Sequence, residues 1–228
     1  MKVYLIAFIL FLFPSIIAFP IVKLIGGKNR YRFGRKSRVG FSLVITPKLH
    51  IEDGAMILNG NFIRVTAIKM RKDSIIKCFN ILKGNYQVCM DEKTVINKSN
   101  KIVNALCEKQ VSSLVIGYNS IIGVNHFIDM THNVVIGKNS ILAGIGSQLW
   151  THSFYHDKQG SGRIREEKAI EIGNNIYVGS RCIICPGVMI VDTISIGAGA
   201  VISKPLLKPG LYVNQSLRYI DREAHPVV

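Results

Sequence analysis

Acidic residues are scarce in this chain of 228 residues. It has 14 Asp and Glu against 29 Lys and Arg, which gives a formal net charge of +15 at pH 7. A surface so short of acids implies an anionic neighbour, such as a nucleic acid, a membrane surface or a phosphorylated substrate. Aromatic residues that alternate with the basic ones are also missing, apart from Tyr31 and Phe33, and this argues against nucleic acid.

A regular cysteine framework is absent as well. The five cysteines are odd in number and irregularly spaced, which fits a reducing compartment better than a secreted disulfide scaffold. Cys182 and Cys185 imitate a redox or zinc pair. Both also fall within the six-residue repeat described below, where small core residues are expected.

Charge of either sign is missing between Val3 and Val22. This apolar run is long enough to cross a bilayer as one helix, with Pro14 as a kink. Seven cations follow without an intervening acid: Lys23, Lys28, Arg30, Arg32, Arg35, Lys36 and Arg38. We therefore predict a membrane-anchor helix at residues 1–25 and a basic juxtamembrane segment at 26–38, which holds the rest of the chain at the cytoplasmic side of the inner membrane.

A cleaved signal peptide is the alternative for this segment. Lys2 and the apolar stretch after it imitate the first two regions of such a signal. Against it, the apolar run is long, and its end, SIIAFP, offers no convincing cleavage site with small residues.

A six-residue period begins at Ile172. The blocks IGNNIY, VGSRCI, ICPGVM, IVDTIS, IGAGAV and ISKPLL each start with Ile or Val and carry an apolar or small residue four positions on. One flat strand and one tight corner per block explain this period, with three blocks to a triangular coil. The pattern predicts an all-β fold, a left-handed parallel β-helix of hexapeptide repeats, preceded by the N-terminal hydrophobic helix.

Weaker series of the same period precede these blocks. They extend the predicted β-helix domain to residues 39–220, followed by a C-terminal tail at 221–228. Between about Met70 and Ser113 the period is lost, and irregular coils or a short helix near residues 103–109 both fit this stretch.

The period is interrupted once more near its C-terminal end. It stops at about Gln148 and resumes at Ile172, so we expect residues 151–169 to form a loop that projects from a corner. Loops on a rigid scaffold often carry binding and catalytic groups, and this one contains His152 and His156.

These motifs resemble the hexapeptide-repeat acyltransferases, and among them the maltose, galactoside and capsular-polysaccharide O-acetyltransferases. Four motifs in order carry the resemblance: Thr151-His152 at the start of the loop, IGNNIYVGS from Ile172, PGV from Pro186 and GAGAVISK from Gly197. The resemblance implies transfer of an acetyl group from acetyl-CoA to a sugar hydroxyl. The sugar would belong to a capsular or cell-surface polysaccharide, or to its lipid-linked precursor.

The resemblance also implies roles for single residues. His152 falls on the catalytic histidine. The positions that it assigns to coenzyme A are Ser180, Ala198, Ser203, Lys204 and Arg218. On the acceptor side the segment VNHFIDMTH departs from the family's sugar-binding pattern. The acceptor residues that we expect are Asn125, Asp129, Trp150 and His156.

Acetyl transfer from a thioester to a hydroxyl needs a base that removes the hydroxyl proton. A neutral imidazole accepts this proton and then delivers it to the departing thiolate, so we assign this role to His152, and no metal is required. A second group must hold the other ring nitrogen, and Asp129 or a loop carbonyl could serve. Trp150 either stacks against a sugar ring or packs at the root of the loop.

Two other functions stay open. A zinc enzyme of the γ-carbonic anhydrase type would use His126, His152 and His156 as ligands shared between subunits, but it gives the PGV and ISK motifs no role. An inactive β-helix scaffold would bind no coenzyme A. His126 and His132 fall at block ends and are expected to be corner residues. The three flat sides of the prism and the polar loop predict a homotrimer with its sites between subunits.

Overall fold

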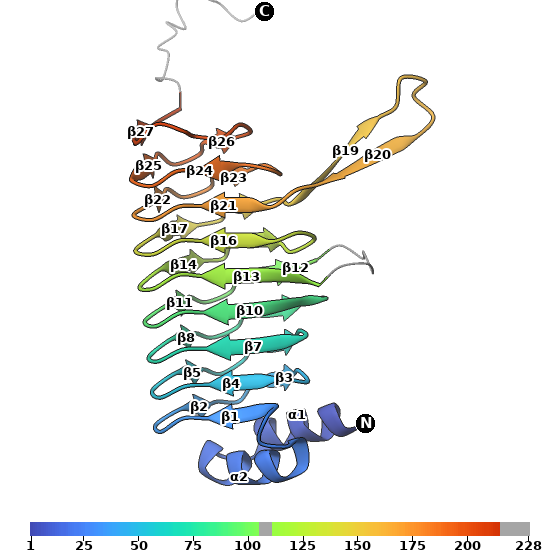
Figure 1. The fold of residues 1–228 in the computed structure, drawn as a ribbon, viewed down its shortest axis with the longest axis vertical. Coiled ribbons are helices and arrows are strands. Elements are labelled where there is room, and N and C mark those ends of the chain that lie inside the picture. The colour runs from blue at the N-terminus through green and yellow to red at the C-terminus, as the bar shows by residue number, and fades with distance from the viewer. Residues whose placement is uncertain (105–110, 215–228) are drawn as a thin grey trace, which may run out of the picture.

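The structure is a computed structural model that describes residues 1–104 and 111–214. Within these residues the chain winds into a parallel β-solenoid, with two helices at one end of the stack (Figure 1). Most coils place one short strand in each of three parallel sheets, which we call the first, second and third faces. The parallel β-helix predicted from the six-residue period is confirmed, while its left-handed winding stays a prediction.

The strands of the three faces follow one another in chain order. The first face contains β1 (Tyr31–Phe33), β4 (Leu49–Ile51), β7 (Ala67–Met70), β10 (Tyr86–Met90), β13 (Ser112–Ile116), β16 (Val134–Ile136), β21 (Ile170–Ile172) and β24 (Met189–Ile190). The second contains β2 (Arg38–Val39), β5 (Met56–Ile57), β8 (Ile75–Ile76), β11 (Val95–Ile96), β14 (Ile121–Val124), β17 (Ile141–Ile145), β22 (Tyr177–Val178), β25 (Ile194–Ile196) and β27 (Gly210–Tyr212). The third contains β3 (Leu43–Ile45), β6 (Phe62–Arg64), β9 (Ile81–Lys83), β12 (Lys101–Val103), β15 (Phe127–Asp129), β18 (Gln148–Leu149), β23 (Ile183–Ile184) and β26 (Val201–Ile202).

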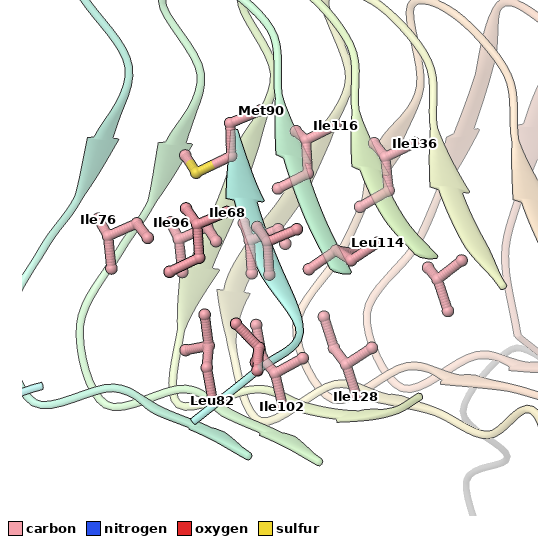
Figure 2. Close-up of a cluster of buried hydrophobic side chains, with 14 of the residues drawn as sticks. Ile68, Ile76, Leu82, Met90, Ile96, Ile102, Leu114, Ile116, Ile128 and Ile136 are labelled. Carbon is pink, nitrogen blue, oxygen red and sulfur yellow. The ribbon is translucent and has the colours of Figure 1, made fainter. Parts of the chain in front are cut away.

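The core consists of aliphatic ladders along the axis of the solenoid. The first residues of the six predicted blocks are all buried, at no more than 5% exposure: Ile172, Val178, Ile184, Ile190, Ile196 and Ile202. In Figure 2, Leu82, Ile102 and Ile128 form one such ladder on the third face, because strand pairing places them directly above one another. Each coil therefore buries its aliphatics against the next coil, so burial is continuous although one coil alone has no core.

The described part of the stretch in which the sequence lost its period belongs to the solenoid. Five strands, β8 to β12, lie between Met70 and Ser113, so the described coils there pair regularly and are not the irregular coils that were one expectation. The other expectation, a short helix near residues 103–109, falls mostly outside the described residues. The coil that joins the paired residues Met70 and Met90 is longer than the coil that joins the paired residues Tyr177 and Ser195. The added residues fall where the chain passes from the third face to the first, which we call the long corner. Because this corner varies in length, the aliphatics lose a strict six-residue spacing although they stay stacked.

The predicted single N-terminal helix is corrected to two helices. Helix α1 spans Lys2–Leu12 and α2 spans Ser15–Gly26, with Phe13 extended between them. Phe13 precedes Pro14, and a residue before proline is driven out of the helical region, so Pro14 ends the helix instead of kinking it. Among the described residues, no helix combines the length and the apolar character needed to cross a bilayer.

Both helices pack against the first coil. Helix α1 contacts β3 and α2 contacts β1, where the rings of Phe19 and Phe33 stack with their centroids 3.8 Å apart. Ser15 Oγ donates to the carbonyl of Val39 at 3.0 Å and accepts from its N–H at 2.9 Å. The solenoid thus begins at Tyr31, earlier than the boundary expected at Val39, because Tyr31 is already an inward residue.

Candidate functional site

The central feature of the site is a buried pair of side chains at the long corner. Asp129 ends β15, and His152 begins β19 (His152–His156) one coil further on. Strand pairing places Ile128 beside Leu149, so the residues that follow each of them meet at the corner. The Nδ1 atom of His152 lies 2.7 Å from Oδ2 of Asp129, and the two side chains are 16% and 2% exposed.

Two threonines hold the carboxylate of Asp129. Thr151 donates its N–H and its hydroxyl to Oδ2 at 2.9 and 2.7 Å, and the Thr131 hydroxyl donates to Oδ1 at 2.7 Å. Burial alone raises the pKa of Asp129, but the hydrogen bonds from Thr151, Thr131 and His152 outweigh burial and hold the pKa below its usual value. Asp129 is therefore ionised at neutral pH, although its side chain is buried.

This geometry fixes the tautomer of the His152 ring. An ionised Asp129 only accepts hydrogen bonds, so the 2.7 Å contact requires a proton on Nδ1 of His152. The lone pair then lies on Nε2, which is the form that removes a proton from a hydroxyl. Of the two partners expected for the ring, Asp129 or a loop carbonyl, the structure selects Asp129.

The loop expected at residues 151–169 is an antiparallel hairpin. Its strands β19 and β20 (Arg163–Glu167) pair from His152 with Glu167 to His156 with Arg163. In Figure 1 the hairpin projects from the edge of the stack, so only its root belongs to the solenoid. His152 stands at this root, where rigid coils hold it, while His156 lies exposed at the other end of the strand.

Aromatic rings border His152 on both sides. Its ring lies edge-on to Trp150 at 6.0 Å and to Phe154 at 5.8 Å between centroids. Trp150 in turn packs against Phe127 at 4.7 Å and donates its Nε1–H to Gln148 at 2.9 Å. These contacts support packing of Trp150 at the loop root, and its stacking on a sugar stays a prediction.

Two of the predicted acceptor residues lie away from the pair. Asn125 occupies the corner at the opposite end of β15 and adopts a left-handed backbone with φ 53°. That conformation suits asparagine in a tight corner. None of the contacts of the described residues links Asn125 or His156 to His152. Asp129 does contact His152, but as the partner of its ring.

His126 is a corner residue, as expected from its block-end position. It belongs to a column of polar side chains at the corner between the second and third faces, in which each side chain accepts a backbone N–H of the next coil. The column contains Ser42, Asn61, Asn80, Asn100, His126 and Ser147. Burial lowers the pKa of His126 to about 4, so its ring is neutral and enclosed.

The predicted coenzyme A residues lie at two corners of the solenoid. Ser180 and Ala198 follow β22 and β25 on successive coils, between the second and third faces. A Cβ atom on Gly144 would lie 1.8 Å from Ser180 Oγ, so the corner requires glycine there. Ser203 and Lys204 are exposed and follow β26 at the long corner, two coils beyond His152. Arg218 lies outside the described residues.

No group of three or more His, Cys, Asp or Glu within the described ranges is arranged to hold a metal ion. His126 is enclosed at another corner, and His156 lies at the far end of β19, so the three histidines of the zinc hypothesis do not meet within the chain. Cys182 and Cys185 are free thiols. Cys182 is fully buried in the repeat, as its position predicted, and burial raises its pKa.

Sequence reasoning missed Thr131. Its hydroxyl and its N–H both contact Oδ1 of Asp129, two residues earlier in the chain. An Asp followed two positions later by Thr is a local signal for such a turn, in which the carboxylate accepts from the backbone. The sequence alone does not show that this turn belongs to the site, because Thr151 donates to the same carboxylate from the next coil.

These features define a parallel β-solenoid protein with a buried His–Asp pair at the root of a projecting hairpin. No known family model matches the sequence. Galactoside O-acetyltransferase of Escherichia coli (strain K12) is 33% identical over 96 residues, which are 42% of this chain and 47% of the relative. The chain thus spans about half the length of the curated relative that it matches. The match and the solenoid together fit a hexapeptide-repeat acetyltransferase, and they confirm the resemblance seen in the sequence.

Solved structures of similar proteins were also found. A galactoside acetyltransferase in complex with coenzyme A is 28% identical, with a TM-score of 0.41 over 48% of this chain and 56% of that one. A polysialic acid O-acetyltransferase is 16% identical, with a TM-score of 0.48 over 86% of this chain and 95% of that one.

Proposed function

We propose that this protein is an acetyl-CoA-dependent O-acetyltransferase that acts on a sugar hydroxyl. The observation that carries the proposal is the His152–Asp129 pair at 2.7 Å, because it supplies an oriented neutral imidazole at the root of a projecting hairpin. The sequence match to a galactoside O-acetyltransferase covers 96 residues and supports acetyl as the group transferred and a sugar as its acceptor.

The reaction follows from the chemistry of the pair. Nε2 of His152 takes the proton of the acceptor hydroxyl as its oxygen attacks the thioester carbonyl of acetyl-CoA. The C–S bond then breaks, the acetyl group stays on the sugar oxygen, and the proton passes from Nε2 to the thiolate of coenzyme A. Asp129 keeps its negative charge throughout and stabilises the imidazolium that forms between the two steps, in the way described for other His–Asp pairs.

A groove on the third face, on the coils between the N-terminal helices and Asp129, supports an anionic acceptor. It has a volume of about 880 Å³ and is lined by the cations Arg64, Lys83 and Lys101 on the third face. Arg64 and Lys83 lie directly opposite each other on paired strands, a placement of like charges that is unfavourable without a counter-charge. None of the lining residues is acidic, and none of the ion pairs of the described residues involves these three cations.

Along the third face the described lining of the groove stops at β12, one strand before the strand of Asp129 and two strands before the one that precedes His152. Val103 lines the groove and is paired with Asp129 on the next strand. We infer that an acidic chain of a capsular or cell-surface glycan lies along the third face, with one hydroxyl at His152. Such a glycan carries a series of anionic groups, which are carboxylates where the sugars are acidic and phosphates where phosphodiester links join the sugars.

We further propose that the enzyme is a homotrimer that works at the cytoplasmic face of the inner membrane. The polar hairpin of β19 and β20 projects from the stack, and contact with a neighbouring subunit would give it a surface against which to pack. Light scattering in mild detergent tests the trimer, and a monomeric mass would contradict it.

The decisive test of the function is direct product analysis. The protein is incubated with labelled acetyl-CoA and a panel of acceptors: a neutral galactoside, an acidic oligosaccharide and a phosphodiester-linked oligosaccharide. We expect release of coenzyme A and an O-acetylated product whose position NMR can map. Absence of transfer to every acceptor, together with no thermal shift on addition of coenzyme A, would favour an inactive scaffold.

A further inference from the structure

The two N-terminal helices expose an unusual number of large apolar side chains. Ile16 and Leu24 are 84% and 86% exposed, which leaves almost the whole of each side chain without a protein contact. We call the full set the apolar base, and its members are Tyr4, Leu5, Phe8, Phe11, Leu12, Phe13, Ile16, Ile17, Ile21 and Leu24. Soluble monomers rarely expose large apolar surfaces, so ten such side chains on two neighbouring helices indicate a partner.

The opposite side of the same helices is already occupied. Ile6, Leu10 and Val22 are buried against the first coil, at no more than 2% exposure. The helices are therefore apolar both toward the solenoid and away from it. A helix that is apolar all round is normally buried all round, in a protein core or in lipid.

The charges around the apolar base distinguish between these two partners. The chain has no acidic residue before Glu52, while Lys2, Lys28, Arg30 and Arg32 are exposed close to the helices in the chain. Of the cations in this region, only Arg35 forms an ion pair among the described residues, with Asp53. Glu52 and Asp53 lie beside Arg32 on the first coils, but the cations next to the helices outnumber these acids. An apolar surface bordered mainly by cations matches a bilayer, which offers acyl chains and anionic headgroups together.

We propose that α1 and α2 form a foot that lies in the interface of an anionic bilayer, with the solenoid standing upright on it. In Figure 1 the helices close one end of the stack, and the hairpin leaves near the other end. The flanking cations then lie at headgroup level, and Ile16 and Leu24 reach into the acyl region.

An upright solenoid sets the height of the catalytic corner above the membrane. On the third face, five strand steps separate β3, beside the foot, from β18, which precedes His152. At about 4.8 Å per step, His152 stands about 24 Å above the first coil. Given the proposed acetyl transfer, the acceptor hydroxyl belongs to a sugar several units away from any lipid carrier.

Vesicle binding tests the foot without reference to catalysis. The full chain is sedimented with vesicles of phosphatidylcholine alone and with vesicles that contain phosphatidylglycerol in equal proportion. We compare it with the double variant Ile16→Asp, Leu24→Asp. The matched control is Leu207→Asp, Leu211→Asp, at two residues of similar character that are 68% and 71% exposed at the far end of the solenoid.

We expect the native chain and the control to bind the anionic vesicles, and the foot variant to bind them about tenfold more weakly or worse. The proposal is overturned if the native chain binds neither vesicle, if the foot variant binds like the native chain, or if that variant instead breaks up an assembly of copies. Vesicle binding without any acetyl transfer would contradict the proposed function but would still support the proposed foot.

Quenching of tryptophan fluorescence tests the upright orientation of the solenoid, and Trp150 is the only tryptophan of the chain. Trp150 stands beside His152, so its fluorescence should be unaffected by brominated acyl chains, which quench an indole only on close approach. The comparison is the variant Phe8→Trp, Trp150→Phe, whose introduced indole should be strongly quenched on the same vesicles. Equal quenching of the two proteins would overturn the upright orientation, since both indoles would then lie at the bilayer.

Discussion

Nδ1 of His152 lies 2.7 Å from Oδ2 of Asp129, although 23 residues separate them in the chain. The solenoid brings them together because the end of β15 and the residues after β18 occupy the same corner on successive coils. The hydroxyls of Thr131 and Thr151 also donate to the Asp129 carboxylate, to Oδ1 and Oδ2 respectively. The His152 ring is left with a single orientation and with Nε2 as its reactive atom.

Removal of the imidazole should abolish most of the acetyl transfer. We expect His152→Ala to lower kcat by at least about 100-fold, because a positioned general base supplies a factor of that order. The measurement is the release of coenzyme A with a saturating acceptor, and circular dichroism should show an unchanged fold. The matched control is His156→Ala, four residues along the same strand, which should keep most of the activity. Equal losses in the two variants would mean that the base is wrongly assigned.

Asp129 is a positioning residue, and its substitution should separate catalysis from binding. Asp129→Asn keeps the shape but can present an N–H to the ring, and this favours the wrong tautomer. We expect a fall in kcat of about 100-fold or more, with little change in KM for acetyl-CoA. Nitrogen NMR of His152 provides the second readout: Nδ1 carries the proton in the native protein and loses it in the variant. An unchanged tautomer with full activity would contradict this role.

The basic groove should control KM for a charged acceptor. Charge reversal in Arg64→Glu, Lys83→Glu removes the attraction for carboxylates or phosphates and should raise this KM by about tenfold or more. Transfer to a small neutral galactoside should change little. The control is Lys69→Glu, Lys77→Glu, which makes the same change in net charge at exposed positions outside the groove. If both double variants raise KM equally, net charge and not the groove is responsible.

The parts of the fold that the sequence predicted are those with a strict local period. From Ile172 to Ile202 each aliphatic block head is buried as predicted, because the coils there divide evenly into three blocks of the period. Between Met70 and Met90 the coil is longer, so the same stacking leaves no regular period in the sequence. The site shows the same limit. His152 was found by its motif, whereas its pairing with Asp129 depends on how consecutive coils stack, and the sequence left two partners open.

His126 should make the stability of the fold depend on pH. Its folded pKa is lowered by burial to about 4, from a model-peptide value of about 6.5. Between these values the unfolded chain binds more protons than the folded one, so stability is fully present above about pH 6.5 and falls as pH drops toward 4. We expect the free energy of unfolding to fall by about 2 kcal/mol from pH 7 to pH 5 through this group, measured by urea titration.

His126→Asn should remove that pH dependence. The coils below already place Asn61, Asn80 and Asn100 at the same corner, and each accepts the N–H of the next coil through its Oδ1. The Ser147 N–H, which now donates to His126 Nδ1 at 2.9 Å, would find the same kind of acceptor. His156→Asn, at an exposed position, should keep the native slope. Asp129 titrates below its usual value and so does not contribute between pH 7 and pH 5. A slope that persists in His126→Asn would assign the effect to another group.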